Sequence, residues 1–274
     1  MRIPTGSRNF LKSALVLIVF SSLFSFFAAA QDNTSDFLSN SVLDILPKPT
    51  KNSIVTLVSI EKFPFKEHYY LAQYYTSIKD NSNRALIGKE EQSTLIPDLS
   101  LAFIEFQGKK TGVKLVASSI PIRQEVDKLE MIDQGFQFYG FKLDPTNYNI
   151  CNFGISFGLS SNWSIYYPGG CHTDDEYLDL FVVLGSEILH VFSICAYHEQ
   201  VGASRIDGEM EVWESLSEQN HLDLLPHKTD GFSDLKVTHY VNNNLDEIQE
   251  EKPDSIEVYQ WNKTLKRYTL QKRI

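Results

Sequence analysis

The chain has 274 residues, of which 42% are hydrophobic, and its formal net charge is −10. That hydrophobic share is enough for a packed core, which excludes disorder as the general state of the chain. The acidic balance repels phosphate backbones and anionic lipid headgroups, so the charge alone predicts no nucleic-acid or membrane partner.

Residues 1–30 have the three parts of a secretory signal: a basic start, an apolar run over residues 14–27, and small residues up to Ala30. The apolar run is shorter than the roughly 20 residues that cross a bilayer, which favours a cleaved signal over an uncleaved anchor. We predict cleavage between Ala30 and Gln31, and an exported chain, periplasmic or secreted, with no stable membrane insertion afterwards. Since the signal carries three basic residues and no acidic one, the other 244 residues carry −13.

Polar residues with two prolines fill 31–52, which we interpret as a leader or linker. Residues 53–274 then show short β-branched, aromatic or alternating runs separated by turn residues, which is typical of strands. The predicted strands cover residues 54–60, 68–76, 100–107, 113–118, 136–143, 153–159, 177–184, 188–197, 210–216, 222–225, 232–240, 256–261 and 265–270. One helix is predicted, over residues 122–132, from apolar positions 122, 126, 129 and 132.

No alternation of strands with helices appears, so a parallel α/β fold is not expected. The pattern predicts a mainly β protein, built as an antiparallel sandwich or as barrel-like sheets, with at most one or two short helices. A subdivision near residues 119–135 would separate an N-terminal sheet from a C-terminal one. A single continuous sandwich fits the sequence equally well.

The three cysteines are Cys151, Cys171 and Cys195. In an oxidising compartment two of them can pair. A hairpin turning at residues 160–162 would place Cys151 opposite Cys171, which is the disulfide we predict. A Cys171–Cys195 bridge and three free cysteines are the alternatives.

Gly154-Ile155-Ser156-Phe157-Gly158 matches the nucleophile-elbow pattern of hydrolases, which requires a strand, a sharp turn at the serine and then a helix. Here the alternation continues straight past Ser156, which favours an ordinary half-buried strand. Residues 171–176 bring together Cys, His, Asp and Glu, but no second cluster completes a metal site, so we interpret them as a solvated acidic loop.

The run Asp230-Gly231-Phe232-Ser233-Asp234-Leu235-Lys236-Val237 resembles one half of an FG-GAP-type repeat. In that family an acidic loop ahead of the run binds calcium within a β-propeller blade. This chain has Pro226 and Lys228 at the earlier acidic positions, and it contains one such run rather than several. Together with the final strands, the run is similar to the C-terminal end of many uncharacterised exported bacterial proteins rich in β-structure, which implies an exported β-rich protein without implying an activity.

No complete catalytic, cofactor-binding or metal-binding motif emerges, so no such residue and no cofactor is predicted. We expect a non-enzymatic binding module for a protein or a cell-envelope component. The alternatives are an exported hydrolase with a non-standard site, involving Ser156 or a pair such as His198 and Glu199, and a structural envelope component.

Overall fold

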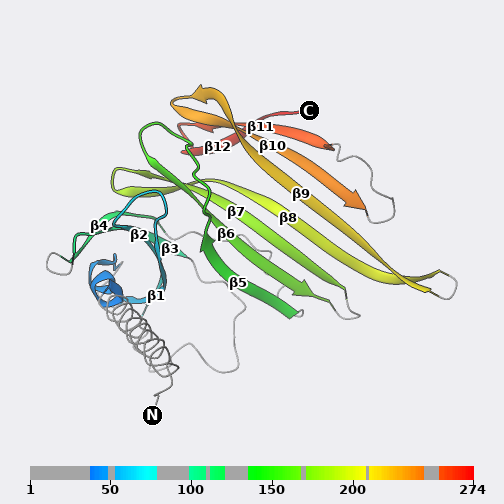
Figure 1. The fold of residues 1–274 in the computed structure, drawn as a ribbon, viewed down its shortest axis with the longest axis horizontal. Coiled ribbons are helices and arrows are strands. Elements are labelled where there is room, and N and C mark those ends of the chain that lie inside the picture. Colours follow the sequence, from blue (N-terminus) through cyan, green and yellow to red (C-terminus); the bar gives the residue numbers. More distant parts are fainter. Residues whose placement is uncertain are drawn as a thin grey trace, which may run out of the picture.

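The computed structural model describes residues 38–48, 53–78, 99–108, 112–120, 135–167, 171–207, 210–243 and 253–274. Twelve strands run through these residues and form one hydrogen-bonded sheet that does not close (Figure 1). They are β1 (Ser53–Lys62), β2 (Tyr69–Ile78), β3 (Ser100–Phe106), β4 (Val113–Ser118), β5 (Gly135–Leu143), β6 (Ile155–Tyr166), β7 (His172–Leu184), β8 (Glu187–Asp207), β9 (Met210–Thr229), β10 (Phe232–Asn243), β11 (Ser255–Asn262) and β12 (Arg267–Arg273). The predicted mainly β fold is confirmed.

The sheet consists of two antiparallel meanders, β1–β4 and β5–β12, in which each strand pairs with the next one along the chain. A single parallel pair, Ser118 of β4 with Glu187 of β8, joins the two meanders. The expected subdivision near residues 119–135 falls between them. Whether the meanders are separate domains stays a prediction.

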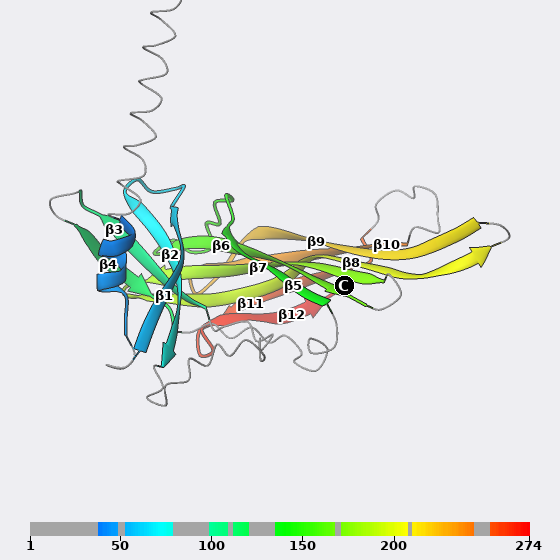
Figure 2. The ribbon, with the colours of Figure 1, turned by 90° about the horizontal axis from the view of Figure 1, so that it is seen from below.

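The first meander packs face to face against β6–β8 at one end of the longer sheet (Figure 2). Phe63 and Phe103 contribute from the first meander, and Phe157, Phe181 and Val183 from the second. The Phe157 and Phe181 rings stack with centroids 5.3 Å apart, and Phe63 meets Phe157 edge to face at 6.0 Å. Aromatic side chains bury a large apolar area, so this layer holds the two meanders together.

The opposite face of β7 and β8 is covered by β10–β12, which curl back over it. Leu180, Val182 and Phe192 on the long strands pack with Leu235 of β10 and Trp261 of β11. The strands β7 and β8 are therefore buried on both faces along this stretch.

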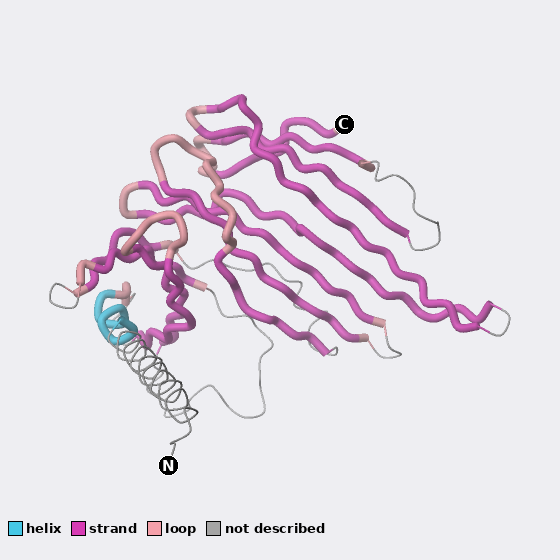
Figure 3. Tube along the Cα trace, viewed as in Figure 1, coloured by secondary structure: helices cyan, strands magenta, loops and turns pink. Residues whose placement is uncertain are grey.

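Residues 38–45 form a helix, coloured cyan in Figure 3, inside the segment that the sequence predicted to be a polar leader or linker. Leu38, Val42 and Leu46 are spaced by four residues and are buried. They pack on the face of the first meander that points away from the second, beside Ala72 and Ile104. The interpretation of this part as a linker was wrong. Its overall polar composition masked an apolar residue at every fourth position, which is the spacing of a helix face. The helix predicted over residues 122–132 and the predicted signal lie outside the described residues.

The turn between β9 and β10 explains the Asp-Gly-Phe run. Asp230 and Gly231 have φ values of 52° and 84°, and Thr229 pairs directly with Phe232. A two-residue hairpin turn of type I′ needs positive φ at both central positions, and Asp-Gly is one of the sequences that favours it. The turn aims Phe232 at Trp261, and the two rings stack with centroids 3.8 Å apart.

Two strands predicted separately, over residues 210–216 and 222–225, are parts of the single strand β9. β10 pairs with β9 along both parts, from Asn243 with Leu216 to Phe232 with Thr229. The polar residues between the two predicted strands pair with β10 as well, so their composition did not mark a turn.

Replacing Trp261 by Ala should remove the stacking partner of Phe232 and leave a cavity. We expect a loss of about 3–5 kcal/mol in the free energy of unfolding, measured by urea denaturation. Leu265→Ala, at a side chain that is 52% exposed, serves as the control and should change it by less than about 0.5 kcal/mol. Equal losses for both variants would contradict the assignment of Trp261 to the core.

Candidate functional site

The long sheet extends well beyond its hydrophobic cores. The members of the two large core clusters on β6, β7 and β8 end at Leu159, Leu178 and Ala196, and beyond them on β6 Trp163 is buried against Tyr177. The strands continue past these points as residues 160–166 of β6, 172–177 of β7, 197–207 of β8 and 210–219 of β9, which we call the distal sheet (Figure 3). Along β7 the six further residues reach roughly 20 Å past the core. No described side chain of the distal sheet belongs to a core cluster.

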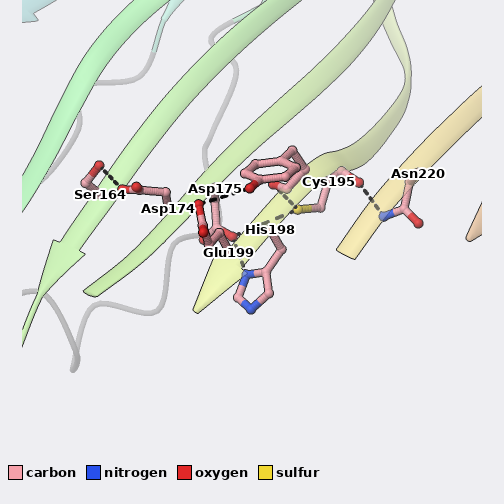
Figure 4. A network of polar contacts seen from close by, with 8 residues as sticks. Ser164, Asp174, Asp175, Cys195, His198, Glu199 and Asn220 are labelled. Carbon is pink, nitrogen blue, oxygen red and sulfur yellow. Dashed lines mark hydrogen bonds and ion pairs between the residues drawn. The ribbon is translucent and has the colours of Figure 1, made fainter. Parts of the chain in front are cut away.

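A Cys–Asp–His group lies where the core gives way to the distal sheet (Figure 4). Asp175 pairs in register with His198, and Tyr177 with Cys195, so β8 contains one extra residue in between. Residues three apart in a regular strand face opposite sides, but this bulge brings Cys195 and His198 to the same side. The Asp175 Oδ1 atom lies 2.6 Å from His198 Nδ1 and 4.0 Å from Cys195 Sγ.

Side-chain hydrogen bonds from Cys195 and Asn220 hold the backbone around the bulge. Cys195 Sγ donates to the carbonyl oxygen of Tyr197 at 3.2 Å. Asn220 on β9 donates from Nδ2 to the carbonyl oxygen of Cys195 at 2.6 Å. These contacts satisfy groups that the bulge removes from the regular ladder, so the group has a clear structural role.

The thiol of Cys195 is not a nucleophile in this arrangement. Burial, followed by the negative charges of Asp175 and Glu218, raises the pKa of Cys195 to about 12. A reactive cysteine needs a depressed pKa and an electropositive surrounding. His198 contacts Asp175, which also faces the sulfur, so within the described residues no imidazole is in contact with the thiol to take its proton.

The other side of the distal sheet carries tyrosines and carboxylates, because successive residues of a strand point to opposite faces. Asp174 and Glu199 pair directly across β7 and β8. Ser164 donates to Asp174, and the Tyr197 hydroxyl donates to Glu199 Oε2 at 3.0 Å. We call this surface the tyrosine face; it comprises Tyr139, Tyr166, His172, Asp174, Tyr197 and Glu199.

Two tyrosines of this face are open to solvent. Tyr139 is 56% exposed and Tyr166 is 44% exposed. The Tyr139 hydroxyl donates to Gln137 Oε1 at 2.9 Å. The Tyr166 ring stacks on the His172 ring with centroids 6.0 Å apart. Their positions are thus fixed by neighbours while large parts of the rings remain free.

The two hydrolase candidates from the sequence do not form a site. Ser156 is the second residue of β6 and is 7% exposed, and its hydroxyl lies 4.0 Å from Cys151 Sγ. A side chain at either glycine would clash with its surroundings. A Cβ atom at position 154 would lie 2.7 Å from the Val183 carbonyl oxygen, and one at position 158 would lie 2.8 Å from the Tyr148 ring. The glycines of the Gly-x-Ser-x-Gly pattern therefore permit close packing. The strand prediction was right, but the strand is buried on both faces at residues 156–159 rather than half-buried.

His198 and Glu199 do not form a pair, because they point to opposite faces: His198 contacts Asp175 and Glu199 accepts from Tyr197. The alternation of a strand predicts this once residues 188–201 are recognised as one strand. Asp175 belongs to the acidic cluster at residues 171–176, but its pairing with His198 was not predicted, since the two lie 23 residues apart and only the register of β7 and β8 brings them together.

The predicted disulfide between Cys151 and Cys171 is absent, and all three cysteines are free. Residues 160–162 do not turn but continue β6, which pairs with β7 from Ile155 with Val183 to Tyr166 with His172. Cys151 and Cys171 therefore lie at opposite ends of a twelve-residue strand pair, roughly 35 Å apart at the rise of a β-strand. Cys195 pairs opposite Tyr177, which also separates it from Cys171.

Residues 172–176 are the first part of β7, so the acidic loop expected there was wrong. Their side chains alternate between the two faces and cannot converge on one ion. Within the described ranges, no three His, Cys, Asp or Glu side chains are grouped as a metal site would require.

The acidic residues of the FG-GAP-like run have separate structural roles. Asp230 occupies the hairpin turn. Asp234 is buried and accepts hydrogen bonds from His227 Nδ1 at 2.6 Å, Thr229 Oγ1 at 2.8 Å and Gln260 Nε2 at 3.0 Å. Burial alone would raise the pKa of Asp234, but the hydrogen bonds from Gln260, Thr229 and His227 outweigh it and lower the pKa.

Comparison with known proteins adds no relative. No family model matches the chain, and no curated protein or solved structure matches it. The resemblance to exported bacterial proteins stays a prediction. In the part of the chain that the structure describes, no helix is long and apolar enough to cross a membrane.

A first prediction concerns the thiol. At pH 8 Cys195 should react with iodoacetamide on the order of a hundredfold or more slowly in the folded protein than in the urea-unfolded protein. Mass spectrometry of the individual cysteine peptides measures the rates. Asp175→Asn removes one of the charges that raise the pKa of the thiol, and should therefore accelerate the reaction. Rapid alkylation of Cys195 in the native protein would refute the protonated thiol.

A second prediction concerns Asp234 and pH. Because its pKa is lowered by folding, its contribution to stability is present above the usual carboxyl pKa of about 3.9 and is lost as the pH falls through the lower folded value. The difference in unfolding free energy between the wild type and Asp234→Asn should thus be largest above pH 5 and should shrink below about pH 4.

Asp230→Asn is the matched control for this measurement, because Asn-Gly also suits the turn. It removes a carboxylate from the same hairpin at an exposed position, and it should change the unfolding free energy at neutral pH by less than about 0.5 kcal/mol. A wild-type advantage over Asp234→Asn that is constant from pH 7 to pH 3 would show that the carboxylate charge is not involved.

Proposed function

We propose that the protein is an exported, non-enzymatic binding module for a protein or a cell-envelope component, and that the distal sheet is its contact surface. The observation that carries the proposal is that four paired strands continue past the large core clusters and present polar side-chain contacts there, between β6 and β7 and between β7 and β8. Export rests on the signal-like residues 1–30.

The composition of the tyrosine face supports this role. Tyrosine offers a large apolar ring and a hydroxyl while losing little side-chain entropy, and it is enriched at binding hot spots. Tyr139 and Tyr166 have exposed rings that are held by Gln137 and His172. Fixing a side chain before binding reduces the entropy cost of association.

The neighbouring carboxylates supply hydrogen-bond acceptors on the same face. The side chain of Asp174 is 39% exposed, and its Oδ2 atom lies 3.7 Å from His172 Nε2. A surface of rings, hydroxyls and carboxylates without a lysine or arginine among its members suits a partner that presents hydrogen-bond donors or positive charge. It does not suit a polyanion.

The test is site-specific photo-crosslinking in an exporting bacterial host. A photoreactive amino acid at Tyr166 should give a defined adduct, whereas the same amino acid at Phe65, an exposed aromatic position on the first meander, should not. With the identified partner purified, Tyr139→Ala and Tyr166→Ala together should raise the Kd at least about tenfold.

An adduct of equal yield at both positions, or an unchanged Kd for the double variant, would rule out the distal sheet as the contact surface. Unfolding curves of the double variant provide the control for folding. Since neither ring belongs to a core cluster, the substitutions should change the stability little.

A further inference from the structure

Positive charge is gathered at the C-terminal end of an otherwise acidic chain. Residues 263–274 contain five of the 25 basic residues and none of the 35 acidic ones. The other 262 residues therefore carry a net charge of −15. The net charge of the whole chain does not reveal this difference between residues 263–274 and the rest.

The structure presents these residues on the β11–β12 turn and on β12. Every residue of 263–274 is exposed except Tyr268 and Thr269. In the described part of the sheet, β12 pairs with β11 alone and is an edge strand. Tyr268 anchors the strand, since its ring packs on Trp261 and its hydroxyl donates to the Ser233 carbonyl oxygen at 2.7 Å.

Three of the five cations have no ionic partner among the described residues. Arg273 is bound to the buried carboxylate of Glu257, and Lys266 lies 3.4 Å from the exposed Glu187. No carboxylate among the described residues lies within ion-pair distance of Lys263, Arg267 or Lys272. These three charges are available to an external anion.

Apolar side chains stand exposed among the cations. Leu265 is 52% exposed, Leu270 is 47% exposed and Ile274 is 65% exposed. Leu265 lies in the β11–β12 turn, Leu270 lies within β12, and Ile274 directly follows the strand. Cations and exposed apolar side chains that lie close together along an exposed edge of a sheet suit a membrane interface, where cations meet lipid phosphates and apolar groups enter the headgroup region.

We propose that β12 and the β11–β12 turn form a peripheral docking surface for an anionic phospholipid membrane. This surface is separate from the distal sheet and does not depend on it. The acidic remainder of the chain is repelled by the same membrane, so the charge distribution orients the protein with β12 toward the lipid. Pairing with another strand is disfavoured, because lysines on an edge strand oppose edge-to-edge association.

The experiment is co-sedimentation of the full chain with vesicles. At low salt the protein should pellet with phosphatidylcholine vesicles that contain phosphatidylglycerol, and not with pure phosphatidylcholine. Binding should weaken as salt is added, since surface electrostatics are screened. The triple substitution Lys263→Gln, Arg267→Gln and Lys272→Gln should weaken binding at least about tenfold.

The matched control removes the same charge from other strands through Lys62→Gln, Lys114→Gln and Lys142→Gln, three exposed positions. It should bind like the wild type. All three proteins share the same N-terminal segment, so a difference between them reports on the substituted residues. A second variant, Leu265→Ser with Leu270→Ser, should also bind more weakly, and urea unfolding checks that each variant folds.

Three results would overturn the proposal: no binding of the wild type to the anionic vesicles, an unaffected triple variant, or an equal loss in the control. Competition by free glycerol phosphate at constant ionic strength would assign the cations to a soluble anion instead. Binding to a soluble polyanion such as polyglutamate that equals the binding to vesicles would likewise exclude a specific role for lipid.

Discussion

The burial of β7 on both faces is the constraint on which the rest of the structure depends. Leu180, Phe181 and Val182 are consecutive residues, and each is at most 1% exposed. Phe181 faces the first meander, and its two neighbours face β10–β12. A strand that is covered from both sides fixes two layers at once, so a change at this point affects both cores.

The sequence predicted most strands, because turns such as Asp230-Gly231 and the alternation of apolar residues are local signals. The errors occurred where a local pattern had another cause. Ser160 and Ser161 look like turn residues, yet they continue β6 and pair with β7. The helix at residues 38–45 was missed, since its apolar stripe is short and its stability comes from packing on the first meander.

The candidate site was much less accessible from the sequence. Asp175, Cys195 and His198 meet through the register of two strands and a bulge, and neither feature is encoded by the spacing of those residues. The basic composition of residues 263–274 was visible in the sequence. Its exposure on an edge strand depended on the curling of β10–β12 over β7 and β8.

The order of the strands in the sheet also determines how the chain can acquire its structure. Among the described strands, every antiparallel strand pair joins strands that are consecutive in the chain, and the parallel contact of Ser118 with Glu187 and the bridge of Cys151 with Phe232 span long separations. Local pairing lowers the contact order and favours rapid folding. The unfolded chain can therefore assemble hairpin by hairpin, and the association of the two meanders, which needs the distant contacts, follows as the later and slower step.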